Sequence, residues 1–335
     1  MRLTLPALLL WAAAIAAPLA AEPMPTLLGN IAIHDPSIIV TDDGWASFAT
    51  GVERAADGGA VRTKSSPDGI TWSETGPLPG GIPAWVKKEL GFAPRNIWAP
   101  NVSRHGDTVY MYYSVSSFGR NNSVVGLMTN TAFDAARPAE GWEDKGLVFR
   151  SRRDDWLNAI DPFRIDVGDR AFLAFGSYWD GIRMIELDPV TGLRQGEGEP
   201  LRLASRNGDA IEASAILEHD GKFYLFVSFD ACCKGTTSTY RIMVGRADAV
   251  DGPYLDRDGK PMLEGGGTQL LATTGRYIGP GGQEVFEVNG APWLAFHYYD
   301  GEDGGTPKLQ LAPLGWSADG WPELGPLPGT GKTSK

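Results

Sequence analysis

The sequence predicts an all-β fold: a five-bladed β-propeller with four antiparallel strands in each blade. Hydrophobic residues make up 42% of the 335 residues and the 43 glycines show no three-residue period, so disordered and collagen-like classes are excluded. A hairpin pattern recurs five times along the chain, and a second hairpin follows each copy. Four-stranded units that recur in this way are typical of propeller blades.

The first hairpin of each unit opens at a small or acidic residue, passes through a polar turn and returns as an aromatic-rich strand. The opening motifs are, in chain order, His34-Asp35-Pro36, Trp98-Ala99-Pro100, Ile160-Asp161-Pro162, Ile211-Glu212-Ala213 and Gly279-Pro280-Gly281. The second hairpins are expected over residues 64–72, 125–142, 184–194, 243–254 and 309–321. When the five units are aligned on Asp35, the residues at the same position, or phase, in the other units are Ala99, Asp161, Glu212 and Pro280.

The chain divides into a targeting segment and one domain. Residues 1–21 have the basic start, apolar run and small-residue end of a secretory signal peptide, and the alternative is a retained membrane anchor. Residues 22–335 are expected to form a single propeller domain, because no linker-like stretch divides them. We expect residues 24–33 to close the ring as a strand against the last blade, residues 84–90 to form a short helix, and residues 329–335 to be loose.

The charge balance restricts the partners. The chain has 41 acidic and 30 basic residues, a net charge of −11. Nucleic acids and anionic membranes require a positive surface, so neither is expected, and a neutral substrate fits better. The protein is expected to be secreted or periplasmic, and monomeric. In such a compartment Cys232 and Cys233 form either a strained bond between neighbours or two free thiols, and the sequence leaves both open.

Three of the five counterpart positions carry a carboxylic acid, namely Asp35, Asp161 and Glu212. Inner strands line the axis of a propeller, so equal phase predicts that these acids cluster around one funnel, which charge repulsion makes costly. The alternative is that each acid only shapes the start of its strand. Acids in a cleft supplied with 11 Trp and 10 Tyr suit glycoside hydrolysis. Metalloprotease, phosphate-loop and G-x-S-x-G motifs are missing from the sequence.

Several motifs occur in order along nearly all of the chain that follows residue 21. They are His34-Asp35-Pro36-Ser37, Trp98-Ala99-Pro100, Asn158-Ala159-Ile160-Asp161-Pro162, Ser177-Tyr178-Trp179, Ile211-Glu212-Ala213, Cys232-Cys233-Lys234-Gly235 and His297-Tyr298-Tyr299-Asp300. As a set they resemble glycoside hydrolase family 43, and within it the endo-1,5-α-L-arabinanases. The resemblance implies a five-bladed propeller and an inverting hydrolase that cleaves α-1,5-linked L-arabinan internally. The alternatives are an exo-acting arabinanase, arabinofuranosidase or xylosidase of the same family, and a non-catalytic propeller that binds glycans.

The resemblance also implies roles for single residues. Asp35 is the expected general base and Glu212 the general acid, while Asp161 orients that acid and keeps its pKa high. The residues expected to contact the sugar are His34, Trp98, Phe118, Asn158, Ser177 and Trp179. The chemistry is expected to require no cofactor.

Two positions depart from the family pattern. Arabinanases commonly carry Gly-Pro-Gly-His in the fifth blade, and that His helps to hold a cation such as calcium at the axis. Gly282 replaces it here, which argues against a calcium ion. His297 is the remaining candidate metal ligand, and the alternative is that it is a packed, hydrogen-bonded residue. Asn101 stands where the family often has Asp, and we expect it to remove a negative charge from the cleft rim.

Overall fold

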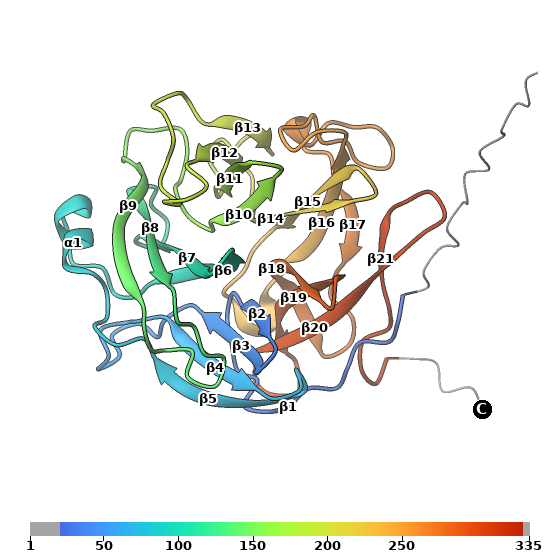
Figure 1. Ribbon diagram of the computed structural model, residues 1–335. Helices are drawn as coiled ribbons and strands as arrows, with labels where there is room; N and C mark the ends of the chain where they lie inside the picture. The colour runs from blue at the N-terminus through green and yellow to red at the C-terminus, as the bar shows by residue number, and fades with distance from the viewer. Residues whose placement is uncertain (1–20, 331–335) are drawn as a thin grey trace, which may run out of the picture.

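The computed structural model describes residues 21–330, and these form a ring of five β-sheets around a central axis (Figure 1). The five-bladed propeller predicted from the sequence is therefore confirmed. The predicted signal peptide lies outside the described residues except for Ala21, and so do residues 331–335 of the predicted loose end. Among residues 21–330, no helix combines the length and the hydropathy needed to cross a membrane.

Each blade is an antiparallel meander that runs from the axis outward. Blade 1 contains β2 (Ser37–Thr41), β3 (Gly44–Ala49), β4 (Arg62–Ser66) and β5 (Thr71–Pro77). Blade 2 contains β6 (Trp98–His105), β7 (Thr108–Val115), β8 (Ser123–Asn130) and β9 (Glu143–Ser151). Blade 3 contains β10 (Phe163–Val167), β11 (Arg170–Phe175), β12 (Ile182–Leu187) and β13 (Leu201–Ala204). Blade 4 contains β14 (Ile211–His219), β15 (Lys222–Phe229), β16 (Arg241–Ala247) and β17 (Thr268–Leu271). Blade 5 contains β18 (Tyr277–Val288), β19 (Ala291–Asp300), β20 (Thr306–Trp316) and β21 (Pro322–Leu324).

The helical segments are short. The helix α1 (Ala84–Leu90) lies where the sequence predicts it and buries Val86 and Leu90. It ends at Gly91, whose φ of 75° is left-handed and suits a residue without a Cβ. Two 3₁₀ turns, η1 (Gly235–Thr237) and η2 (Met262–Glu264), belong to the loops of blade 4.

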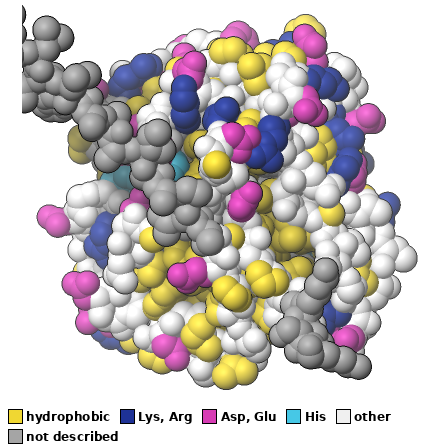
Figure 2. Space-filling view, turned by 90° about the vertical axis from the view of Figure 1, so that its right-hand side faces the viewer, with side chains coloured by type: hydrophobic (Ala, Val, Ile, Leu, Met, Phe, Trp, Pro, Cys, Tyr) yellow, Lys and Arg dark blue, Asp and Glu magenta, His cyan; other side chains and the backbone are white. Residues whose placement is uncertain are grey.

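The core lies between the blades. The second strand of each blade is buried on both faces, because its sheet packs against a neighbouring blade on either side. Its aromatic residues fill these contacts, and Tyr112, Phe226 and Phe296 are fully buried. Figure 2 shows the right-hand side of the ring of Figure 1, where Lys and Arg side chains are interspersed with Asp and Glu side chains.

The ring is closed by the segment before β2. The strand β1 (Leu28–Gly29) joins blade 1 as a fifth, parallel strand by pairing Leu28 with Thr71 of β5. Four residues further on, Ala32 forms a bridge with Lys308 of β20. The expectation of a strand against the last blade is therefore partly correct. The Ile33 N–H donates to the Pro307 carbonyl and the Leu309 N–H donates to the Ile31 carbonyl, while Leu28 and Gly29 pair with the outer edge of blade 1.

Four of the five predicted second hairpins end before their outer strand begins. The ranges 125–142 and 309–321 end directly before β9 at Glu143 and β21 at Pro322, whereas 184–194 and 243–254 end well before β13 at Leu201 and β17 at Thr268. In blade 3, the Asp188 carboxylate accepts the N–H groups of Val190 and Thr191 and so makes a local turn. The turn has the residue types of a hairpin turn, but the residues on its two sides form only one β-bridge, between Leu187 and Arg194.

Candidate active site

Five equivalent residues at the start of the inner strands have a left-handed backbone. Their φ values are 53° for Asp35, 39° for Ala99, 56° for Asp161, 54° for Ala213 and 57° for Gly282. A positive φ is uncommon in residues other than glycine and is held only where the surroundings impose it. Its recurrence in all five blades makes it a property of the ring.

This repeat corrects the phase predicted from the sequence. The predicted counterparts in blades 4 and 5 were Glu212 and Pro280, but the structure places Ala213 and Gly282 at these positions. Glu212 occupies the preceding position, which corresponds to His34 in blade 1. The register of β14 shifts between Glu212 and Ala215, and a bulge of this kind leaves no mark in hairpin spacing.

The N–H groups of these left-handed residues donate to side chains. In four blades the acceptor belongs to the preceding blade, where it lies in the second strand or directly after that strand. The bonds run from Ala99 to Thr50 Oγ1 (2.9 Å), Asp161 to Ser114 Oγ (3.2 Å), Gly282 to Ser228 Oγ (3.0 Å) and Asp35 to His297 Nδ1 (3.1 Å). The equivalent residue of blade 3 is Gly176, which has no side chain. The Asp161 Oδ2 atom accepts the Ala213 N–H instead, at 3.1 Å. Asp161 is thereby fixed beside the backbone of the residue that follows Glu212.

Asp35 lies at the mouth of the axis, with 21% of its side chain exposed. Its Oδ2 atom accepts hydrogen bonds from His34 Nδ1 at 2.8 Å and from the Thr50 hydroxyl at 2.6 Å. Burial alone would raise the pKa of Asp35, but the charge and hydrogen bond of His34, together with His297 and Thr50, hold it well below its usual range. The same contact raises the pKa of His34, although burial opposes it. Asp35 is therefore an ionised carboxylate.

Glu212 has the opposite environment. Its side chain is buried, its Oε2 atom accepts a hydrogen bond from Ser177 at 2.6 Å, and its Oε1 atom is bonded to the Tyr240 hydroxyl. Burial and the charge of Asp35 raise the pKa of Glu212 to about 7, although the Ser177 hydroxyl opposes them. Glu212 therefore carries a proton in mildly acidic solution.

Asp161 completes the group of acids. Burial, followed by the charges of Glu212 and Asp35, raises the pKa of Asp161, and the Ala213 N–H is the one hydrogen bond that opposes this shift. Two carboxyl groups this strongly coupled titrate as a pair. Removing the second proton from the Asp161 and Glu212 pair places two like charges in a buried site, so the pair retains a proton.

The structure distributes the six expected sugar contacts over several positions. His34 and Ser177 lie directly on Asp35 and Glu212. Phe118 is 78% exposed in the loop that follows β7, and Trp98 and Trp179 are half-buried. Asn158 is buried and its Oδ1 atom accepts a hydrogen bond from Ser123 at 2.6 Å.

Four further residues of this region were not predicted from the sequence. Tyr240 and Thr50 bond the two catalytic candidates, and Tyr299 bonds His34 Nε2 at 2.8 Å. Trp156 is 79% exposed, and its carbonyl accepts the N–H of Asp180 in the loop of Trp179. A Trp at position 156 could have been proposed from the sequence as a sugar-stacking residue. The hydroxyl groups of Tyr240, Thr50 and Tyr299 are identified only by the residues that they contact.

Cys232 and Cys233 form a disulfide, so the choice that the sequence left open falls to the bond between neighbours. The pair lies beside the mouth of the site. The Cys233 N–H donates to the Tyr299 hydroxyl at 2.7 Å, and the Cys233 Sγ atom lies 3.8 Å from His34 Nε2.

The residues at the axial mouth do not fit a calcium ion. His34, Asp35 and His297 bring one ligand atom each within 4.8 Å of one another. However, the Nδ1 lone pair of His297 accepts the Asp35 N–H, and both ring nitrogens of His34 have hydrogen-bond partners. Gly282 offers no side chain as a further ligand, and a Cβ at this position would lie 2.6 Å from Asp35 Oδ1. Calcium takes six to eight oxygen ligands, and this set offers one carboxylate.

Chelation is therefore expected to leave activity unchanged. Incubation with excess EDTA, followed by removal of the chelator, should alter the initial rate of substrate cleavage by less than about twofold, since the site's hydrogen bonds need no ion. The matched arm adds Ca²⁺ to the treated protein. A rate that falls on chelation and returns with Ca²⁺ would contradict this prediction.

Asn101 is not at the cleft rim, contrary to the expectation. It is buried near the axis, where its Nδ2 atom donates to Glu284 Oε2 at 2.8 Å and its Oδ1 atom accepts the Arg164 N–H at 2.9 Å. Burial raises the pKa of Glu284 to about 8, although hydrogen bonds from Ser37, Asn101 and the Ile38 N–H oppose the shift. An Asp at position 101 would oppose a second acid here, so the amide suits the buried Glu284.

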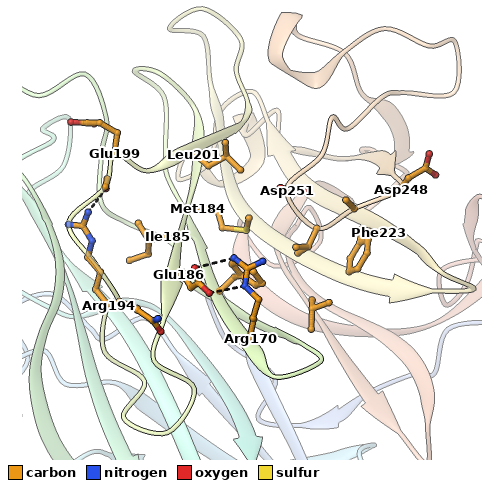
Figure 3. A pocket seen from close by; sticks show the side chains of 16 residues that line it. Arg170, Met184, Ile185, Glu186, Arg194, Glu199, Leu201, Phe223, Asp248 and Asp251 are labelled. Atoms are coloured by element: carbon orange, nitrogen blue, oxygen red, sulfur yellow. Dashed lines mark hydrogen bonds and ion pairs between the residues drawn. The ribbon is translucent and has the colours of Figure 1, made fainter.

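A separate hollow of about 530 Å³ lies between blades 3 and 4 (Figure 3). Arg170 and Glu186 point toward each other in it and form two hydrogen bonds, of 2.8 and 3.1 Å. Its lining contains none of Asp35, Asp161 and Glu212. The axial mouth, where ionised and protonated carboxyl groups face each other, is the better candidate for catalysis.

Comparison with known proteins yields one family and several close relatives. The family described as glycosyl hydrolases family 43 matches residues 27–322. The extracellular endo-α-(1→5)-L-arabinanase 1 of Bacillus subtilis (strain 168) is 39% identical over 88% of this chain and 88% of its own. The extracellular exo-α-(1→5)-L-arabinofuranosidase ArbA of Cellvibrio japonicus is 35% identical over 88% and 87%. The GH43 endo-arabinanase from Bacillus licheniformis superposes with a TM-score of 0.81 at 40% identity, covering 89% of this chain and 99% of that one.

Proposed function

Because the chain belongs to glycosyl hydrolase family 43, we propose that it hydrolyses α-1,5-linked L-arabinan, internally and with inversion at the anomeric carbon. The observation that carries the proposal is the opposite protonation of two acids in one site. The pKa of Asp35 is lowered and that of Glu212 is raised to about 7, so a base and an acid coexist near neutral pH.

In the proposed reaction, the Asp35 carboxylate accepts a proton from a water molecule as that water attacks the anomeric carbon. Glu212 gives its proton to the glycosidic oxygen as the bond to that carbon breaks. Asp161, fixed by the Ala213 N–H, shares one proton with Glu212, and the repulsion between two charges keeps that proton in the pair until the glycosidic oxygen accepts it from Glu212. After the reaction, Asp35 holds the water's proton and Glu212 is ionised, and exchange with solvent restores both groups.

The carboxyl groups supply all proton transfers in this scheme, so we propose that no cofactor takes part. The relatives from Bacillus subtilis and Cellvibrio japonicus are both named extracellular, which supports export of this protein. A polymer or oligomer of L-arabinose is the proposed substrate, and the protein is proposed to act as a monomer.

Digestion of linear, debranched arabinan tests the function and its mode together. Internal cleavage is expected to produce a ladder of oligosaccharides early in the time course, whereas release of one short product from the start would show end attack. Nuclear magnetic resonance of the first product gives its anomeric configuration, and inversion predicts the β-anomer. Absence of any new reducing end would overturn the proposed function.

The pH dependence follows from the two shifted acids. Glu212 must be protonated, so kcat/KM is expected to fall about tenfold per pH unit well above its pKa of about 7. Asp35 must be ionised, and because its pKa is lowered, the acid limb is displaced below the usual range of a carboxyl group. Initial rates on short arabino-oligosaccharides between pH 4 and 9 measure both limbs. An alkaline limb that persists in Glu212→Gln, measured with an activated aryl substrate, would assign that limb to another group.

A further inference from the structure

The backbone and the carboxylate of Asp35 are joined by one closed series of hydrogen bonds through three aromatic side chains. The Asp35 N–H donates to His297 Nδ1 at 3.1 Å, and His297 Nε2 lies 3.3 Å from the Tyr299 hydroxyl. That hydroxyl lies 2.8 Å from His34 Nε2, and His34 Nδ1 lies 2.8 Å from Asp35 Oδ2.

The proton positions in this series follow from its one fixed donor. A backbone N–H always donates, so His297 Nδ1 is an acceptor and the proton of its neutral ring is on Nε2. Burial, and then the neighbouring His34 ring, lower the pKa of His297, so the neutral ring is the stable form. His297 Nε2–H therefore points at the Tyr299 oxygen.

Tyr299 receives a second N–H from outside the series. The Cys233 N–H donates to the same oxygen at 2.7 Å, and the Cys232–Cys233 disulfide fixes the backbone that carries it. With two N–H groups donating to its oxygen, Tyr299 donates its own proton to Nε2 of the neutral His34 ring, which places the proton of that ring on Nδ1. When the raised pKa of His34 leaves the ring protonated, Nδ1 carries a proton as well. That proton is the one that Asp35 accepts.

We propose that Tyr299 is a positioning residue for the general base, and that the Cys232–Cys233 disulfide acts on the base through the Tyr299 hydroxyl. The inference rests on the proposed function. In it, Tyr299 does not contact the reacting atoms. It holds the His34 ring so that Nδ1–H, and not a lone pair, faces the Asp35 carboxylate, which keeps the carboxylate ionised and oriented toward the attacking water.

Tyr299→Phe removes the hydroxyl without changing the ring. Because misplacement of a catalytic group lowers the rate of the chemical step, we expect kcat on linear arabinan to fall about 10- to 100-fold with KM within about twofold. The control is Tyr298→Phe, which removes the hydroxyl of the preceding residue of β19, whose buried ring packs on Tyr277. It should leave kcat unchanged. A rise in KM with unchanged kcat for Tyr299→Phe, or equal losses in both variants, would overturn the inference.

A double-mutant cycle tests the disulfide. Replacing both cysteines by serine should lower kcat in the wild-type background and have little further effect in Tyr299→Phe, because the Cys233 N–H then has no hydroxyl to hold. Full additivity of the two losses would show that the disulfide acts by another route. Thermal unfolding of every variant confirms that it is folded at the assay temperature.

A spectroscopic arm is independent of activity. The chain has 4 histidines, so the ¹⁵N resonances of their rings are assignable by substitution in a tag-free protein. At a pH above the raised pKa of His34, the wild type is expected to show His34 with its proton on Nδ1 and His297 with its proton on Nε2, and Tyr299→Phe should add the Nε2–H form of His34. An unchanged His34 spectrum in Tyr299→Phe would overturn the inference. If the wild type fails to cleave arabinan, the proposed function is wrong, and this spectrum still decides whether Tyr299 orients His34.

Discussion

Replacing Glu212 by Gln is expected to lower kcat on linear arabinan about 10²- to 10⁴-fold, because the leaving oxygen loses its proton donor. The amide has nearly the size of the carboxyl group, so the contacts with Ser177 and Tyr240 are largely kept and the effect reports chemistry. Reducing-sugar release under identical conditions measures the change.

The control for charge is Glu218→Gln, at an exposed position of the same strand, β14, and it should retain full activity. An aryl arabinofuranoside whose leaving group needs no protonation gives a second check. On it, Glu212→Gln should recover most of the wild-type rate. If both substrates are cleaved equally slowly by this variant, Glu212 is not the general acid.

The second large effect is expected for Asp35→Asn, with a loss of about 10²- to 10⁴-fold on the polymer. Without the carboxylate, no group at the mouth accepts the proton of the attacking water. Asn tolerates a left-handed backbone better than most residues, so the φ of 53° at this position is maintained. Circular dichroism and thermal unfolding are expected to match those of the wild type.

Asp35→Asn should differ from Glu212→Gln in its response to the aryl substrate. A better leaving group does not replace the base, so the loss should persist on both substrates. Asp43→Asn, in the exposed turn between β2 and β3, is the matched control and should be fully active. Recovery of Asp35→Asn on the activated substrate would exchange the roles assigned to the two acids.

The blade count could be predicted from the sequence because a hairpin is a local structure. Polar turns and aromatic-rich strands identified the first hairpin of all five units. The short helix at Ala84–Leu90 was also predicted from its local sequence. The outer strands of blades 3 and 4 could not be predicted, since they follow long loops whose length no local pattern sets. The turn capped by Asp188 shows that hairpin-like residues do not guarantee a second strand.

The three acids of the site were predicted from the sequence, but the alignment of the five units that led to them was correct for only two of these acids. Asp35 and Asp161 do share a phase, whereas Glu212 lies one residue before it. Glu212 pairs with Ser228 as Trp98 pairs with Ser114, and both strands then shift register, so the counterpart of Glu212 in blade 2 is Trp98 and not Ala99. The role of Asp161 depends on Gly176, which follows fifteen residues later, directly after β11, and leaves the Ala213 N–H without a partner from that side. Such a dependence is a property of the ring and is apparent only when equivalent positions of all five blades are superposed.

The way in which the ring is closed also determines how the enzyme fails. Leu28 pairs with blade 1 and Ala32 with blade 5, and Asp35 follows only three residues after that second contact. Damage to this short stretch would release the amino-terminal edge and the catalytic base in the same event, before most of the remaining sheets are disturbed. Loss of turnover should therefore precede loss of the bulk circular dichroism signal during unfolding, so that the activity of a preparation is a more sensitive measure of its intactness than its secondary structure.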